Sequence, residues 1–185
     1  MRFTPAQLLD GIPEAERSAM RLDGEIARLA LGDVPLDAID SPALRAGVAL
    51  PRRDARLVAE LGTAAWIWGA RDAPPEPPEL CVELRSRVVR PLDGAIRLRE
   101  RTLPAAQVRE LDGVRVTGRA LTAIDLARDR AVLADVDRRA IALLLADAAG
   151  GAEGVLEILD SLPSPHRRRA ASRLREIAAQ EALTR

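Results

Sequence analysis

A turn dipeptide between two short apolar runs constrains the fold of this chain more than any other feature. Asp112-Gly113 separates Val108–Leu111 from Arg115–Thr117, and such a dipeptide between two such runs is a strong signal for a β-hairpin. The second run leads into a helical pattern at Leu121–Leu126. A strand coupled directly to a helix requires both kinds of element in one domain, so we expect an α+β fold.

Two segments upstream of the hairpin also have the composition of strands, namely Leu80–Leu84 and Ala95–Arg101. In the second segment, apolar residues alternate with Arg97 and Arg99. This alternation is typical of a sheet with one covered face and one solvated face. Together with the hairpin, these segments predict a small mixed or antiparallel sheet.

Helical patterns dominate the chain after the hairpin. Apolar residues such as Ile141 and Leu144 recur at helical spacing, and Gly150-Gly151 provides a stop. The predicted segments are Leu121–Leu126, Asp135–Ala149, Ala152–Leu162 and Arg167–Ala182. We therefore expect helices to cover the sheet and to form the C-terminal part of the chain.

The first 41 residues predict a smaller module of a different kind. A short helix followed by a two-stranded ribbon is the second half of a winged helix, and the first half is reduced here. Pro35 restricts the second strand to a sheet edge. The predicted elements are helices at Thr4–Asp10 and Pro13–Leu22, strands at Glu25–Leu29 and Val34–Ile39, and a turn at Gly32-Asp33. We therefore divide the chain into a reduced winged-helix-like module, 1–41, and an α+β domain, 42–185.

The sequence pattern predicts helices at the start of the second domain. We expect a short helix over 42–50 and a longer one over Asp54–Trp68, because the apolar residues from Leu57 onward fall on one stripe. The proline-rich segment Ala73–Pro78 then predicts a stiff, extended linker.

Composition excludes several classes of enzyme. The chain has no lysine, which removes phosphate-loop and Schiff-base chemistry. His166 is the single histidine and Cys81 the single cysteine, so the chain lacks the Cys/His pairs of a structural zinc site. We read His166 as a loop residue and Cys81 as a small buried side chain. We expect no catalytic residues, no metal site and no cofactor.

The same features bear on location. The chain has no apolar stretch long enough to span a membrane, and residues 1–5 run into an acidic amphipathic pattern that differs from a secretory signal. A single cysteine is typical of a reducing compartment. We expect a cytoplasmic protein without a membrane partner.

Nucleic-acid binding by the first module is one hypothesis. Residues 1–80 carry 9 Arg against 13 acidic residues, whereas residues 81–185 carry 19 Arg against 15. Arg17 and Arg21 lie four positions apart on the expected recognition helix, and Arg28 lies in the expected wing. The surrounding acidic residues oppose contact with a phosphate backbone. The alternative is a structural cap on the main domain.

A basic run near the C-terminus is the second candidate surface. On a helix, Arg168 and Arg175 share one face, Arg169 and Arg173 share another, and Ala170 and Leu174 belong to a core-facing stripe. The candidate partner-binding residues are Arg167, Arg168, Arg169, Arg173 and Arg175. The alternative is a solvated helix whose arginines pair partly with Glu176 and Glu181.

Three residues in apolar surroundings remain. Trp66 and Trp68 are two apart on a helix, so we expect one in the core and the other over a neighbouring strand or at an interface. Asp125 lies within an apolar helix and needs a partner. The candidates for a structural ion pair with Asp125 are Arg115, Arg119 and Arg128.

Two motifs in this order resemble a known family. They are Thr63-Ala64-Ala65-Trp66 and the later Gly113–Thr117 segment, which is followed by Thr122, Asp125 and Arg128. With the wing-like segment before them, they make the chain from about Leu22 onward similar to the AbiEi antitoxins of type IV toxin-antitoxin systems, in the form common in actinobacteria.

This resemblance implies a transcriptional regulator with two roles. Its N-terminal winged helix would bind the promoter of its own operon, which a homodimer would favour. Its C-terminal domain would neutralise a toxin that looks like a nucleotidyltransferase. The short, acidic N-terminal module departs from the family pattern, so the alternative is a protein-interaction module without DNA binding.

Overall fold

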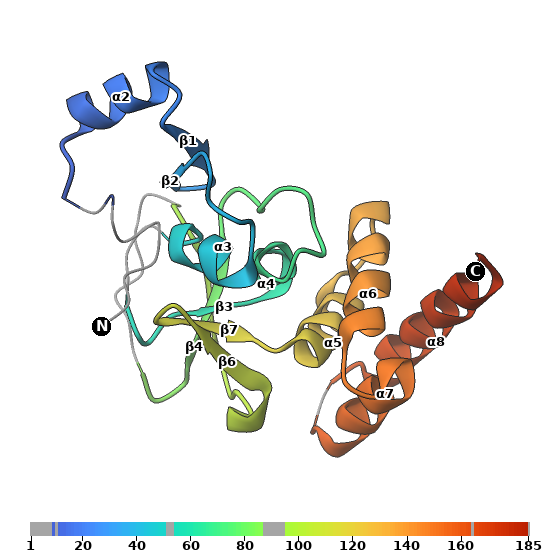
Figure 1. The fold of residues 1–185 in the computed structure, drawn as a ribbon. Coiled ribbons are helices and arrows are strands. Elements are labelled where there is room, and N and C mark those ends of the chain that lie inside the picture. The colour runs from blue at the N-terminus through green and yellow to red at the C-terminus, as the bar shows by residue number, and fades with distance from the viewer. Residues whose placement is uncertain (1–8, 10, 51–53, 87–94, 164, 185) are drawn as a thin grey trace.

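A five-stranded sheet lies at the centre of the chain, between the N-terminal module and a group of helices (Figure 1). The computed structural model describes residues 9, 11–50, 54–86, 95–163 and 165–184. The strands are β3 (Val58–Ala59), β4 (Glu79–Glu83), β5 (Arg97–Arg101), β6 (Val108–Leu111) and β7 (Val114–Thr117). Their order is β5-β4-β3-β7-β6, in which β3–β4 and β6–β7 are antiparallel and β3–β7 and β4–β5 are parallel. The prediction of a mixed sheet in an α+β fold is confirmed.

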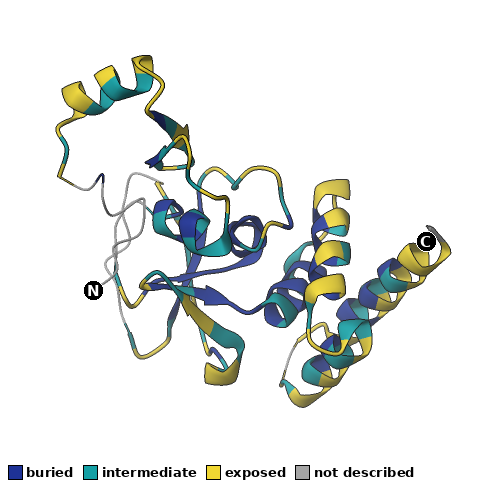
Figure 2. Ribbon diagram, in the orientation of Figure 1, coloured by how far each residue is buried: buried dark blue, intermediate teal, exposed yellow. Residues whose placement is uncertain are grey.

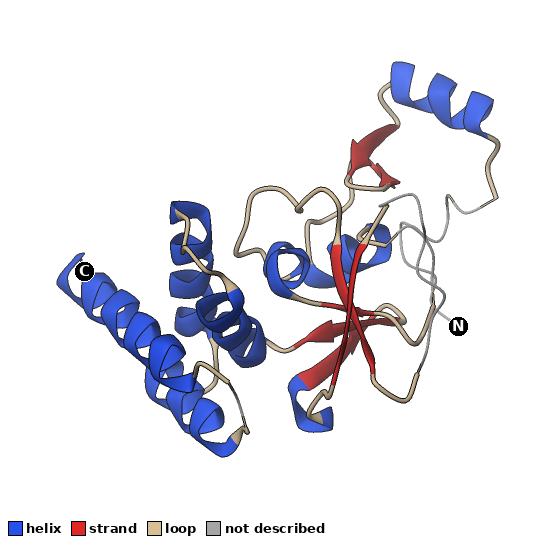
Figure 3. Ribbon diagram, turned by 180° about the vertical axis from the view of Figure 1, so that it is seen from behind, coloured by secondary structure: helices blue, strands red, loops and turns tan. Residues whose placement is uncertain are grey.

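Helices pack against both faces of this sheet, because Leu80 shares a core cluster with Trp66, whereas Cys81 on the opposite face shares one with Leu121. The C-terminal helices stand beside the sheet in the view from behind (Figure 3). The helices are α3 (Pro42–Val48), α4 (Leu61–Ile67), α5 (Arg119–Asp129), α6 (Asp135–Asp147), α7 (Gly151–Ser161) and α8 (Arg167–Thr184), with a 3₁₀ turn at Ala105–Gln107. The buried helix α5 contacts α4, α6, α7 and α8. Ile124, Leu144, Leu159 and Leu174 are among the buried side chains that join these helices into one core (Figure 2). The four predicted C-terminal helices are confirmed.

The predicted hairpin and its connection to α5 are present. Asp112 and Gly113 both have positive φ angles, 51° and 72°, as the tight turns that join twisted strands require. At the end of β7, the hydroxyl of Thr122 donates to the carbonyl of Thr117 at 3.0 Å. Thr117 and Thr122 also share a hydrogen bond between their hydroxyls at 2.8 Å. These bonds fix the angle between strand and helix, so the threonines of the second motif have a structural role.

The N-terminal module contains α2 (Glu14–Leu22) and a ribbon of β1 (Ile26–Leu29) and β2 (Gly32–Pro35). The ribbon turns at Ala30-Leu31, since Leu29 pairs with Gly32, so the predicted turn at Gly32-Asp33 is wrong. Gly32 is needed for a different reason, because a Cβ there would lie 2.6 Å from Cγ1 of Val48 in α3. The predicted helix over 4–10 lies outside the described residues, apart from Leu9.

The predicted helix over 54–68 is correct only from Leu61 onward. Val58 and Ala59 form β3 instead, which pairs with β4 on one side and β7 on the other. A short apolar run suits a buried strand as well as a helix. Pairing on both sides decides between them, and this pairing depends on residues far away in the sequence.

Candidate functional site

The three arginines proposed for DNA contact lie together, around one buried carboxylate. Asp33 in β2 is 5% exposed, and its Oδ2 lies 2.8 Å from Nη1 of Arg21, 3.6 Å from Nε of Arg17 and 3.7 Å from Nη1 of Arg28. The packing of α2 on the ribbon brings two arginines of the helix and one of β1 into one cluster. Asp33 belongs to β2, although the sequence pattern predicted it as part of a turn.

Glu14 is the second acid of this cluster. Its carboxylate accepts from Nη2 of Arg17 at 2.6 Å and from Arg21. Hydrogen bonds from Arg21 and then Arg17 lower the pKa of Glu14 to about 2. Helix α2 has no buried residue and stands clear of the main domain (Figure 1). The bonds of Glu14 therefore lie within α2, and the helix is joined to the ribbon by the ion pairs of Arg17 and Arg21 with Asp33.

Two of the five arginines proposed for partner binding donate hydrogen bonds to backbone carbonyls within the chain. Nη1 of Arg173 donates to the carbonyls of Ala127 at 2.9 Å and Arg130 at 2.7 Å, and its Nη2 donates to Ala131 at 2.9 Å. Arg169 donates to the carbonyl of Arg128. The last carbonyls of a helix have no partner within it, and cations there also suit the helix dipole. Arg169 and Arg173 thus cap the C-terminal end of α5.

The other three arginines lie on the outer side of α8. Arg167 pairs with Asp160 of α7 at 2.6 Å. Arg168 and Arg175 are exposed, and neither makes an ion pair or hydrogen bond with the described part of the chain. Glu176, the acid expected to pair with this face, is engaged by Nη1 of Arg138 in α6 at 3.0 Å. Arg168 and Arg175 are thus open to a partner.

The fully buried Asp125 belongs to an ion-pair network between β5 and α5. Nη2 of Arg101 donates to its Oδ1 at 3.2 Å, and Nη2 of Arg128 donates to the same oxygen at 2.8 Å. The predicted partner Arg128 is confirmed. Of the other two candidates, Arg115 pairs instead with Glu83 at 2.9 Å, and Arg119 lies over the ring of Trp68.

Arg99 extends the network to two more acids. It forms a two-pronged contact with the buried Glu60, at 2.6 and 2.7 Å, and reaches Oδ2 of Asp129 at 2.6 Å. Burial raises the pKa of Asp125, whereas bonds from Arg128 and Arg99 outweigh burial and lower the pKa of Asp129. Of the two arginines predicted on the solvated face of β5, Arg97 is exposed as expected, whereas Arg99 covers buried carboxylates.

The network has no free reactive group. Its carboxylates are held by guanidinium groups, which do not give up a proton in proteins, and burial raises the pKa of the nearby Cys81 thiol. The described residues contain no group of three or more His, Cys, Asp or Glu side chains that could hold a metal ion. We interpret the network as a structural connection between β5 and α5.

A hollow of about 580 Å³ lies beside this network, at the turn between α7 and α8. We call it the Pro165 hollow. Arg99, Arg101 and Arg128 line its polar side, and apolar side chains, which include Pro104, Leu162 and Pro165, line the rest. Pro165 comes two residues before Arg167, so the hollow opens next to the first turn of α8. A hollow with a partly apolar lining thus lies at the turn that precedes the exposed cations of α8.

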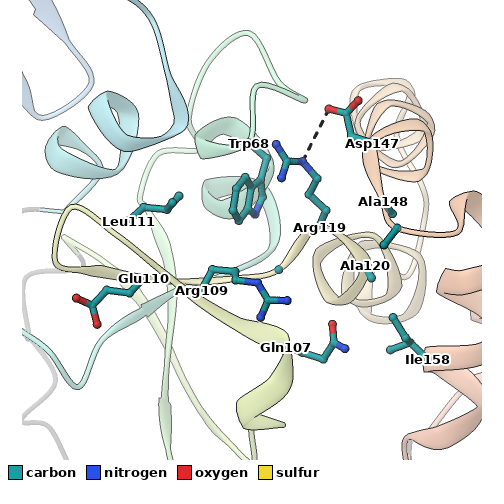
Figure 4. A pocket seen from close by; sticks show the side chains of 12 residues that line it. Trp68, Gln107, Arg109, Glu110, Leu111, Arg119, Ala120, Asp147, Ala148 and Ile158 are labelled. Atoms are coloured by element: carbon teal, nitrogen blue, oxygen red, sulfur yellow. Dashed lines mark ion pairs between the residues drawn. The ribbon is translucent and has the colours of Figure 1, made fainter.

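A second hollow, of about 550 Å³, lies between β6, the start of α5 and the end of α6 (Figure 4). We call it the Trp68 hollow. Its polar lining includes Gln107, Arg109, Arg119 and Asp147. No sequence pattern indicates this hollow, because its lining residues come from separate elements.

The two tryptophans behave as expected. Trp66 is 1% exposed and lies in the core that the sheet shares with α3. Trp68 is half-buried and donates its indole N–H to the carbonyl of Thr117 at 2.7 Å, so it reaches the end of β7. His166 lies in the turn before α8 with a φ of 58°, and Cys81 is buried in β4. The readings of His166 and Cys81 are confirmed.

Comparison with known proteins places these features in a family. Residues 57–177 match the family model described as the AbiEi antitoxin C-terminal domain. The fold is similar to the crystal structure of RV2827C protein from Mycobacterium tuberculosis, with a TM-score of 0.50 and 18% identity over 92% of this chain and 70% of that one. No curated protein sequence matches the chain. Within the described residues, no helix has the length and apolar character needed to cross a membrane.

Proposed function

Because the chain belongs to the AbiEi antitoxin C-terminal domain family, we propose that it is a cytoplasmic antitoxin that neutralises a nucleotidyltransferase-like toxin by direct contact and without catalysis. The observation that carries this proposal is the pair of exposed cations, Arg168 and Arg175, on the outer face of α8. They lie seven residues apart, about two turns or roughly 10 Å along the helix. An acidic surface on the toxin is the complementary partner.

Helix α8 is well suited to present these cations. Its inner face is anchored by Ala170 and Leu174, which are both fully buried, and by the bonds of Arg173 to the end of α5. A helix held on one side loses little conformational freedom when its other side is bound, so less of the binding energy is lost to ordering.

The Pro165 hollow supplies the second part of the proposed interface. Tight protein interfaces usually have a central apolar or aromatic side chain in a pocket and charged groups at the rim. The apolar wall formed by Leu162 and Pro165 offers such a pocket at the turn that leads into α8, three residues before Arg168. We therefore propose that the toxin inserts an apolar side chain there and places acidic groups along α8.

Co-expression with the toxin tests this proposal. The wild-type chain should restore growth of cells that produce the toxin, and the purified proteins should bind each other. Reversal of both charges, Arg168→Glu with Arg175→Glu, should abolish binding and rescue. The matched control reverses two other exposed arginines, Arg85 and Arg139, and should leave both intact. Failure of the wild-type chain to rescue growth would refute the antitoxin role, whereas equal rescue by both double variants would refute only the α8 interface.

Promoter binding is a second proposed function, favoured by one specific observation. The described part of the N-terminal module has one helix followed by a two-stranded ribbon, and its packing gathers Arg17, Arg21 and Arg28 at one place. Asp33 and Glu14 offset two of these three charges, so a single copy presents a weak cationic surface. We propose that a homodimer binds the promoter, because two copies double the contacts with phosphates.

A gel shift on the DNA upstream of the gene tests this second role. Selective binding that weakens as salt increases would support it, because contacts with phosphates release counterions. Arg28→Gln should weaken binding, since Arg28 is the most exposed of the three arginines. Arg85→Gln, outside the module, is the control. Absence of a shift at micromolar protein would favour the alternative, an interaction module without DNA binding.

A further inference from the structure

The Trp68 hollow has the size and lining of a site for a small molecule. Its volume of about 550 Å³ lies within the range of about 300–1,000 Å³ for ligand pockets. Apolar side chains such as Leu111 and Ile158 form part of its wall, together with the ring of Trp68. Ligand pockets typically combine walls of this kind with a few convergent polar groups.

Arg119 is the main polar group of the hollow, and its donors are not used. Its guanidinium lies 4.3 Å from the centre of the Trp68 ring, and Trp68 is itself held by its bond to Thr117. The Nε of Arg119 is buried and has no hydrogen-bond partner, and the carboxylate of Asp147 lies 3.8 Å away, beyond hydrogen-bond distance. A buried donor without an acceptor is uncommon in a native fold. Arg119 is thus held in place and lacks an acceptor.

Two further donors converge on the same space. In Figure 4, the side chains of Gln107 and Arg109 point into the hollow from the side opposite Arg119. Arg109 comes from β6 and Arg119 from α5, so both guanidinium groups are carried by regular elements. Nη1 of Arg109 donates to the carbonyls of Ala106 at 2.8 Å and Val108 at 3.1 Å, so its Nε and Nη2 are the donors that a ligand would use. Asp147 and Glu110 also line the hollow, and both are exposed to solvent, as is Arg109, whereas Arg119 is partly buried. Solvent screens the exposed charges more than that of Arg119.

We propose that the Trp68 hollow binds a phosphate monoester, with the phosphate between Arg109 and Arg119 and the organic part against the apolar wall. A phosphate has three terminal oxygens, which suit two guanidinium groups and the amide of Gln107 better than a carboxylate with two. Asp147 competes with the ligand for Arg119. The proposed site is independent of the antitoxin interface on α8.

Calorimetric titration of the full chain tests this inference. The probes are AMP, adenosine and inorganic phosphate, together with a short oligonucleotide with and without a 5′-phosphate. AMP should bind and adenosine should not. If the phosphorylated oligonucleotide binds more tightly than AMP, the phosphate comes from a nucleic-acid end. If AMP binds at least as tightly, it comes from a free small molecule.

Three variants make the test specific. Arg119→Gln and Arg109→Gln should each weaken AMP binding by roughly tenfold, since each removes charge-assisted hydrogen bonds. Asp147→Asn should strengthen binding several-fold because it removes the competitor, and it changes an exposed side chain. Arg85→Gln, outside the hollow, should have no effect. No binding of any phosphate probe to the wild-type chain, or equal binding by Arg119→Gln, Asp147→Asn and the wild type, would overturn the proposal.

Discussion

Replacement of Asp125 by asparagine tests the ion-pair network with little change in side-chain volume. Asp125 is 0% exposed, and its two oxygens accept hydrogen bonds from Arg101 and Arg128. An asparagine retains one acceptor oxygen and turns an NH₂ group towards the guanidinium groups. The variant therefore leaves two largely buried cations without their shared carboxylate.

The structure sets the expected magnitude. Loss of one partner of a buried ion pair typically costs about 3–5 kcal/mol. Arg101 keeps a second carboxylate, Glu60 at 3.3 Å, and Arg128 keeps Asp129 at 2.7 Å, which places Asp125→Asn at the low end, about 3 kcal/mol. For a chain of this size, the melting temperature should fall by about 6–12 °C.

Asp160 offers a matched control on the surface. It also accepts two hydrogen bonds from one arginine, Arg167, at 3.1 and 2.6 Å, but its side chain is 61% exposed. Asp160→Asn should therefore cost at most about 1 kcal/mol. Urea unfolding followed by far-UV circular dichroism gives both values. Equal losses for the two variants would refute the reasoning, because burial would then make no difference to the ion pair.

Three further predictions concern other parts of the chain. Arg173→Met should lower the free energy of unfolding by about 1.5–3 kcal/mol through loss of the α5 cap, whereas Arg175→Met on the exposed face should change it by less than about 0.5 kcal/mol; denaturant unfolding measures both. Leu174→Ala should lower it by about 2–5 kcal/mol, because the side chain is fully buried in the helical core. The pKa of Glu14 is lowered from 4.5 to about 2, so its contribution to the stability of helix α2 should be fully present above pH 4.5 and lost as the pH falls towards 2. An NMR titration of the Glu14 carboxyl checks this, and in Arg21→Gln the pKa should move back towards 4.5; an unchanged value would contradict the assignment.

Elements defined by local signals could be predicted from the sequence. The turn at Asp112-Gly113 and the helices after it depend on residues close together in the chain, so the sequence pattern predicts both the hairpin and these helices. β3 could not be predicted in the same way, because Val58 and Ala59 become a strand through pairing with β4 and β7. The turn of the ribbon was misplaced because Gly32 was read as a turn residue, whereas it is required by contact with Val48.

The partners of charged residues were harder to predict than the elements. Arg128 could be paired with Asp125 because it lies three residues away on the same helix. Arg101 comes from β5 and meets Asp125 only in the folded chain, so nothing in the sequence indicated this contact. Arg173 was read as a surface cation for the same reason, since its acceptors are carbonyls more than 40 residues away. When the hydrogen-bond acceptors of an arginine lie far away in the sequence, composition alone does not distinguish that arginine from one whose donors are unused.

In a chain whose cations are all arginine, the number of arginines in a segment is therefore a poor measure of binding capacity. What matters is the number of guanidinium donors that folding leaves unused. Arg21 donates to Asp33 and Glu14, and Arg173 donates to three carbonyls, so a ligand would have to replace bonds that already exist. Arg119 in its hollow and Arg168 on α8 lack hydrogen-bonded acceptors in the described part of the chain, so a phosphate or an acidic surface adds bonds at little cost. The strongest effects on binding should consequently come from these two arginines, and the strongest effects on stability from Arg173 and the network around Asp125.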